Sequence, residues 1–261
     1  MKRLLSSSFL TLVAVLFLTG SQLALGAARP PRVHKAPALT KTHAYSGILK
    51  PGTTKPPKPG KGGTVTGSIV QTDQIWECKG PVNLDSVTIT MTPAIIGNRR
   101  DEDAVHLKPG CTGRIGQINV TQWAGDAIKV AEGVHDLTIG GGSIQCLGKA
   151  PGLHQDGVQV MGGARVTFSN LTINCGRAND NLINSNLFIK RAGQSIQPPT
   201  DIVCDHCTFG GYTAHTVTVG ASVRSGITNS TLCVGKFPKL TLSIGSDAVS
   251  PLNSGNTISN C

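Results

Sequence analysis

The chain has 261 residues, a formal net charge of +10 and few aromatic side chains, which make up 4% of the residues. The excess charge lies in the first 63 residues, because from residue 64 onward fourteen basic residues face fourteen acidic ones. A neutral domain with few aromatic rings lacks the basic groove and the stacking platform of a nucleic-acid-binding protein, so we expect no nucleic-acid partner.

Residues 1–28 have the three parts of a secretory signal peptide. Lys2 and Arg3 form a basic start, an apolar stretch follows at 10–18, and the small residues at 26–28 offer a cleavage zone. The apolar stretch is shorter than the roughly 20 residues of a transmembrane helix, and no later segment is apolar enough to span. We expect a secreted protein, extracellular or in the cell envelope, with no membrane span after signal cleavage.

Residues 29–63 are rich in Pro, Lys, Gly and Thr and contain no acidic residue, which predicts a disordered basic linker. The linker could contact an anionic wall polymer electrostatically, or it could be a plain spacer. Residues 64–261 then form one domain. All eight cysteines lie in it, and an even number in an exported chain predicts disulfides.

A repeated phrase runs through the domain: a polar turn residue, a short alternating strand and then glycine. Two examples are "DAIKVAEG" (126–133) and "HQDGVQVMGG" (154–163). Repeats of 23 to 30 residues with no helical periodicity predict an all-β solenoid of about six to eight coils, in which each strand pairs in parallel with its copy. A β-sandwich, the main alternative, does not predict that like residues recur in columns. The strand centres are expected at Val105, Ile128, Val158, Leu187, Val217 and Leu242.

The cysteine spacing also fits stacked coils. Cys146 and Cys175 occupy the same position in two segments that align without a gap, so their Cα atoms should lie about 4.8 Å apart on neighbouring coils. We predict an inter-coil disulfide between them. Cys204 and Cys207 have no second Cys/His pair at zinc-site spacing, so buried or disulfide-bonded cysteines are favoured over a zinc or redox site.

Two columns of side chains are candidates for function. Side chains alternate along each first strand, so one column should face outward. A second column consists of turn residues that begin with three aspartates. Stacked carboxylates repel, so Asp103, Asp126 and Asp156 should recruit a cation such as calcium or raise a pKa, or else cap their turns through backbone N–H groups. The outward column is His106, Lys129, Gln159, Phe188, Thr218 and Ser243, and the turn column is Asp103, Asp126, Asp156, Ser185 and His215.

Two insertions, at 147–155 and 176–184, precede first strands and should form a wall beside the outward column. We predict substrate-binding roles for His106, Gln159, His154 and Lys190, because an extended groove with cationic members suits a linear anionic polymer such as polyuronate. Ordinary solvated surface charge is the alternative for each of them.

The segment "EDAVHLKPGCTGRIGQINVTQWAGDAIKV" (102–130) resembles a stretch of small secreted pectate lyases, and the whole coil pattern resembles the pectin-lyase-like superfamily. This resemblance implies a right-handed parallel β-helix, calcium ligation by Asp103 and Asp126, and a substrate-binding or catalytic role for Lys129. Arg165 and Arg177 are the candidates for the family's catalytic arginine. The family's acid before the second aspartate is Gly125 here.

These observations leave three functions open. A lyase would cleave polyuronate by cation-assisted β-elimination, with Lys129 in an electrostatic role. A non-catalytic protein would bind polysaccharide or serve as a surface scaffold. A glycoside hydrolase would use a pair of carboxyl groups, for which Asp126 and Asp156 are the candidates. In each case we expect a monomer.

Overall fold

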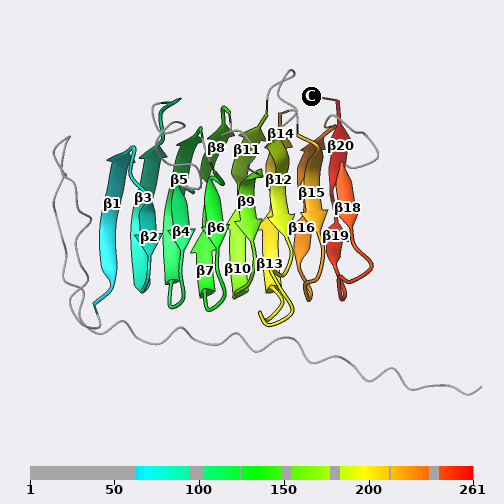
Figure 1. Cartoon of the computed structure of the whole chain (residues 1–261), viewed down its shortest axis with the longest axis horizontal. Helices are drawn as coiled ribbons and strands as arrows, with labels where there is room; N and C mark the ends of the chain where they lie inside the picture. Colours follow the sequence, from blue (N-terminus) through cyan, green and yellow to red (C-terminus); the bar gives the residue numbers. More distant parts are fainter. Residues whose placement is uncertain are drawn as a thin grey trace, which may run out of the picture. The chain divides into compact units, whose positions relative to one another are not determined.

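The computed structural model describes residues 63–93, 103–123, 125–148, 154–176, 183–211, 213–234 and 241–260. Within these ranges the fold is all-β and contains no α-helix. All strand pairings are parallel, and the strands form two sheets (Figure 1). In the same ranges, no helix is long and apolar enough to cross a membrane.

The smaller sheet has seven strands and carries the candidate columns. Its order follows the chain, so each strand pairs with the strand one repeat later. One pass of the chain from one of these strands to the next is called a coil here. The strands are β2 (Trp76–Cys78), β4 (Val105–Leu107), β6 (Ile128–Val130), β9 (Gln155–Val160), β12 (Ile183–Ile189), β15 (His215–Val219) and β18 (Leu242–Ile244).

The larger sheet has thirteen strands and two arms, which are joined because β5 pairs with both β7 and β8. The strands up to the fork are β1 (Val65–Thr72), β3 (Pro81–Thr90) and β5 (Thr112–Gln122). One arm contains β7 (His135–Ile139), β10 (Ala164–Ser169), β13 (Thr200–Asp205), β16 (Gly226–Thr228) and β19 (Leu252–Ser254). The other contains β8 (Gly142–Cys146), β11 (Leu171–Cys175), β14 (Thr208–Gly210), β17 (Thr231–Cys233) and β20 (Thr257–Ser259).

The register of the seven-stranded sheet is the one predicted from the repeats. Val105 pairs with Ile128, which pairs with Val158, and the ladder continues without a shift in these positions through Leu187 and Val217. The predicted parallel pairing of like strands from successive repeats is therefore confirmed. The right-handed winding stays a prediction.

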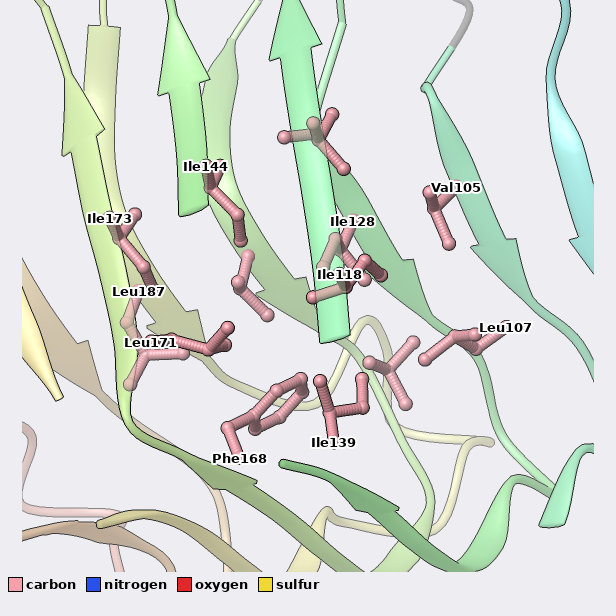
Figure 2. Packing of buried hydrophobic residues seen from close by; sticks show 14 of the residues in the cluster. Val105, Leu107, Ile118, Ile128, Ile139, Ile144, Phe168, Leu171, Ile173 and Leu187 are labelled. Atoms are coloured by element: carbon pink, nitrogen blue, oxygen red, sulfur yellow. The ribbon is translucent and has the colours of Figure 1, made fainter. Parts of the chain in front are cut away.

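The core lies between the sheets and consists of inward side chains that recur from coil to coil (Figure 2). Val105, Ile128, Val158 and Leu187 have no solvent exposure, as the alternation of the strands predicted. Burying each such side chain contributes about 1.5–3 kcal/mol. Because these residues repeat in columns, every coil covers the apolar face of the coil before it.

Glycine is required where the first strand of a coil ends. Gly110, Gly133 and Gly163 all have positive φ, at 87°, 80° and 92°, a conformation that costs little only without a side chain. A Cβ atom on Gly133 would also lie 3.0 Å from the Cβ of Pro109 on the coil before. Backbone geometry thus explains these three glycines of the repeated phrase.

A charged ladder lies at a corner of the thirteen-stranded sheet. Asp136, Arg165, Asp201 and Arg224 occupy equivalent positions on successive coils, and all four have positive φ. The guanidinium of Arg165 donates two hydrogen bonds to Asp136, and that of Arg224 donates two to Asp201. These exposed pairs join neighbouring coils, and each contributes little to stability because solvent screens it.

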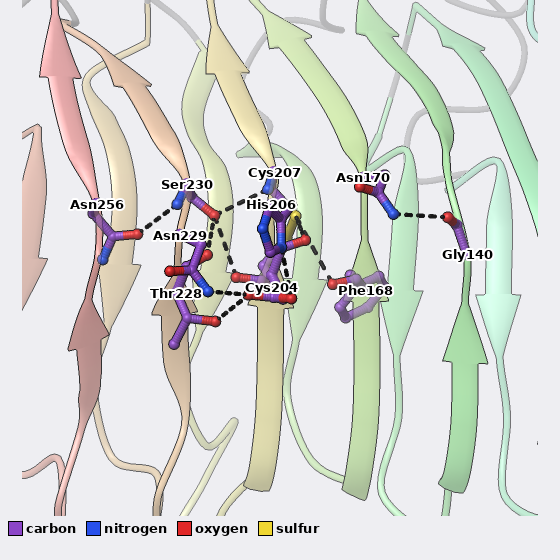
Figure 3. Close-up of a disulfide and its surroundings, with 11 residues drawn as sticks. Gly140, Phe168, Asn170, Cys204, His206, Cys207, Thr228, Asn229, Ser230 and Asn256 are labelled. Atoms are coloured by element: carbon purple, nitrogen blue, oxygen red, sulfur yellow. Dashed lines mark hydrogen bonds and ion pairs between the residues drawn. A yellow bond between two sulfur atoms is a disulfide. The ribbon is translucent and has the colours of Figure 1, made fainter.

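Three disulfides are present among the described residues. Cys146–Cys175 joins paired residues on neighbouring coils, as predicted. Cys78–Cys111 also joins neighbouring coils, although the sheet partner of Cys78 is Leu107. Cys204–Cys207 closes a loop within one coil (Figure 3). The interpretation of Cys204 and Cys207 as buried, disulfide-bonded residues is therefore confirmed, since both are 1% exposed.

Candidate functional site

The outward column is continuous along the seven-stranded sheet. His106 pairs with Lys129, Lys129 with Gln159, and the ladder continues through Phe188, Thr218 and Ser243. It begins one coil earlier than predicted, because Glu77 pairs with His106. The alternation of buried Trp76 and Cys78 around Glu77 is the sequence signal that could have found it. The six predicted members and Glu77 are called the outward stripe below.

The three aspartates stack along one edge of the outward stripe and are buried. The backbone N–H of Asp126 donates to Oδ1 of Asp103 at 2.9 Å, and the N–H of Asp156 donates to Oδ1 of Asp126 at 2.7 Å. The backbone of Ser185 donates to Asp156 in the same way. Each carboxyl thus accepts a hydrogen bond from the backbone of the next coil, whereas the sequence-based alternative was that each aspartate caps its own turn.

Two residues of the outward stripe bring positive charge or hydrogen-bond donors to the first two aspartates. The Nζ of Lys129 lies 3.0 Å from Oδ2 of Asp103 and 3.5 Å from Oδ2 of Asp126, so one ammonium joins carboxyls from neighbouring coils. The Nε2 of His106 lies 2.5 Å from the same Oδ2 of Asp103. Of these contacts, the one between Lys129 and Asp103 depends on the coil register, because these residues are 26 positions apart.

The third aspartate is held by neutral amides. Gln159 donates from Nε2 to Oδ2 of Asp156 at 3.2 Å, and Asn184 donates from Nδ2 to Oδ1 at 3.0 Å. Asn184 reaches this position because the register of β12 shifts between Ile183 and Ser185. A bulge of this kind redirects one side chain. Asn184 could not be predicted, because the repeat pattern contains no signal for the bulge.

The three carboxyls differ in pKa because their surroundings differ. Burial opposes ionisation of Asp103, but the hydrogen bond from His106 and the attraction of Lys129 outweigh it and lower the pKa. Burial, together with repulsion from Asp156 and Asp103, raises the pKa of Asp126 to about 8. Burial also raises the pKa of Asp156 to about 6. At neutral pH, Asp103 is therefore ionised and Asp126 is mostly protonated.

Lys129 remains a cation across the physiological range. Burial disfavours its charged form, but the two aspartates outweigh this effect and raise the pKa of the ammonium. Its side chain is still 28% exposed, so the charge is accessible from the outer face of the sheet. A lysine that acts as a base requires the opposite shift.

The remaining predicted residues are placed as follows. His154 is exposed and lies directly before β9, where its charge acts on Asp156. Lys190 is exposed at the end of β12, with its aliphatic stem over Gly220. Arg165 lies on β10 in the other sheet and pairs with Asp136, so the structure does not bring it to the aspartate column. Arg177 lies outside the described residues.

The described arrangement does not fit a calcium ion held jointly by Asp103 and Asp126. The Lys129 ammonium already lies between these carboxyls, and a divalent cation there would repel it. Calcium also takes six to eight oxygen ligands. Among the described residues no group of three or more His, Cys, Asp or Glu side chains could hold a metal ion.

Comparison with known proteins identifies no relative. No family model matches the chain, and neither does any curated protein or any solved structure. What the chain does must therefore be inferred from the geometry of its own residues.

Proposed function

We propose that this chain is an exported polysaccharide-binding protein whose ligand is an acidic polymer such as polyuronate. The observation that carries the proposal is the position of Lys129, a permanent cation in the outward stripe that carboxyls of two coils hold in place. The three disulfides support an oxidising, extracellular environment.

The ionisation of the aspartates leaves Lys129 able to take a new partner. Because Asp126 is mostly protonated at neutral pH, Asp103 is the ionised carboxylate that contacts the Lys129 ammonium. A uronate carboxylate arriving from solvent would gain a charge-assisted hydrogen bond from the partly exposed ammonium. The protonated Asp126 would not repel it.

The shape of the outward stripe suits a linear ligand. Its seven members lie on seven successive strands spaced by about 4.8 Å, so the stripe extends for about 29 Å. Gln159, Thr218 and Ser243 offer amide and hydroxyl groups to sugar hydroxyls. Lys190, exposed at the end of β12, supplies a second cation on the same sheet.

Binding to immobilised polygalacturonate tests the proposal, with neutral dextran as the negative control. We expect retention that decreases with salt, and about tenfold weaker binding for Lys129→Met, which corresponds to the loss of about 1.4 kcal/mol from a charge-assisted hydrogen bond. Arg165→Met is the matched control, because it removes an exposed cation from the other sheet. No retention of the wild type, or equal losses for both variants, would contradict the proposal.

Lyase activity is a second candidate, favoured by the same cation. A fixed ammonium beside a uronate carboxylate would stabilise the charge that develops during proton abstraction, and Lys129 would have this electrostatic role. Absorbance of unsaturated product, followed with calcium and with a chelator, separates turnover from binding. Product that requires calcium would support a metal-assisted lyase, whereas retention without product supports binding alone.

A hydrolase that uses Asp126 and Asp156 is less well supported by the geometry. The two pKa values of about 8 and about 6 would give one protonated and one ionised carboxyl at neutral pH. However, the residues are only 3% and 1% exposed, so neither carboxyl reaches a glycosidic oxygen outside the sheet. New reducing ends without unsaturated product would favour this reaction.

A further inference from the structure

Phe188 places an aromatic ring on the outer face of the seven-stranded sheet. It is partly exposed, whereas the other two phenylalanines among the described residues, Phe168 and Phe209, are 1% and 0% exposed in the core. Phe188 lies between buried Leu187 and buried Ile189, so the alternation of β12 directs its ring outward. The ring therefore presents apolar surface to a ligand that approaches the outward stripe.

The two neighbours of Phe188 in the outward stripe are polar. Phe188 pairs with Gln159 on β9 and with Thr218 on β15, and these strands lie side by side (Figure 1). The Nε2 of Gln159 donates to Asp156, and the hydroxyl of Thr218 lies 3.5 Å from that of Ser185, so both neighbours contact the turn column. Phe188 is thus an apolar surface between two polar groups. A pyranose ring has a matching pattern, with apolar C–H bonds on its face and hydroxyl groups at its rim.

Lys190 brings a cation to the same strand. It follows Phe188 by two residues, so both side chains leave the same face of the sheet, with Cα atoms about 6.6 Å apart. The backbone N–H of Lys190 donates to Val160 on the coil before, which holds it in the strand geometry. A Cβ atom on Gly220, on the coil after, would lie 2.9 Å from Cδ of Lys190. The absence of a side chain at Gly220 therefore makes room for the lysine stem.

We propose that Phe188 and Lys190 form a subsite for one uronate unit, in which the phenyl ring stacks on the C–H face of the pyranose and Lys190 binds its carboxylate. The proposal rests on the polysaccharide-binding function and makes it more specific. The Lys129 ammonium can pair with a carboxylate of any polymer, whereas an aromatic ring distinguishes a sugar ring from a flexible carboxylate chain. Phe188 lies two strands beyond Lys129, about 9.6 Å along the stripe, so one polymer chain can reach both contacts.

The affinities of the protein for polygalacturonate and for polyglutamate, a carboxylate polymer without sugar rings, test the inference by titration calorimetry. Phe188→Leu keeps an apolar side chain but removes the aromatic face. We expect this variant to bind polygalacturonate about three- to tenfold more weakly than the wild type, with no change in its affinity for polyglutamate. Lys129→Met should weaken binding of both polymers. Lys190→Met should weaken binding of polygalacturonate, because it removes the partner of the carboxylate.

Two further variants complete the test. Phe188→Tyr keeps an aromatic ring and should recover most of the affinity that Phe188→Leu loses. Val70→Ala is the matched control, because it removes exposed apolar surface from β1 in the other sheet and should leave both affinities unchanged. Circular dichroism checks that each variant folds. If Phe188→Leu or Lys190→Met binds polygalacturonate as tightly as the wild type, the subsite is refuted and the binding function stands. Equal losses of Phe188→Leu on both polymers would refute the subsite as well. A wild type that binds no polygalacturonate would refute the binding function and the subsite together.

Discussion

At the scale of single residues, the stacking of coils gives Asp126 a chemistry that it would not have in an isolated turn. Its carboxyl is buried between Asp103 and Asp156, and this raises its pKa to about 8. The same stacking places Lys129 against two of the three carboxyls. The negative charge of the three carboxyls is therefore reduced by groups of the protein itself, namely the Lys129 ammonium and the protons that the carboxyls retain.

The retained protons predict a dependence of stability on pH. The ordinary pKa of an aspartate is 3.8, so above about pH 4 the folded chain keeps protons that the unfolded chain has lost, on Asp156 up to about pH 6 and on Asp126 up to about pH 8. Their contribution to the free energy of unfolding is complete below about pH 4 and is lost as the pH rises toward 8. Asp136 and Asp205, with pKa values of about 2, contribute above about pH 4 and lose this contribution on further acidification.

We therefore expect the free energy of unfolding to be greatest near pH 4–5 and to fall toward pH 8, as measured by urea denaturation across this range. Asp126→Asn should make the alkaline side of the profile flatter, because it removes the carboxyl whose pKa is raised most. Asp136→Asn, the control, should affect only the acidic side. A wild-type profile that rises between pH 5 and pH 8 would refute this account of the column.

The sequence predicts the members of this site better than their contacts. The aspartates and six of the seven members of the outward stripe follow from strand alternation and the repeat; Glu77 was not predicted. Asn184 does not, because a bulge brings it to Asp156. The position of Arg165 could not be predicted either, because its turn belongs to the other sheet, where it pairs with Asp136.

At the scale of elements, most strands are short, so the stability of each depends on pairing with its neighbours in the adjacent coils. β4 and β6 have three residues each, whereas β5 has eleven because it pairs with both arms of the larger sheet. The sequence predicts the short strands through their alternation. It does not predict the fork at β5, because the fork depends on which later strands pair with each half.

The inter-coil disulfide should stabilise such short elements. Cys146 and Cys175 are 29 residues apart, so removing the bond with a double Cys→Ala variant should lower the free energy of unfolding by about 3 kcal/mol. Cys204 and Cys207 are only three residues apart, and the same change there should cost about half as much through chain entropy. Chemical denaturation of both variants measures this difference, and an equal loss would argue against the inter-coil role.

At the scale of the whole molecule, the core, the Cys146–Cys175 disulfide and the candidate site all arise because equivalent residues of successive coils lie in columns. The sequence predicts this architecture because like residues recur at each coil. It predicts less well how the stack ends, since the exposure of Ile258 depends on the absence of a covering coil in the described residues.

Cysteine pairs engineered into the outward stripe test the coil register most directly. Gln159 and Phe188 are paired on neighbouring coils, so Gln159→Cys with Phe188→Cys should place the Cα atoms about 4.8 Å apart and form a disulfide. Gln159→Cys with Thr218→Cys spans two coils, about 9.6 Å, which is too far for a bond. Peptide mapping without reduction should find the first crosslink and not the second. The second crosslink without the first would contradict the stacking from which the site, the core and the binding proposal all follow.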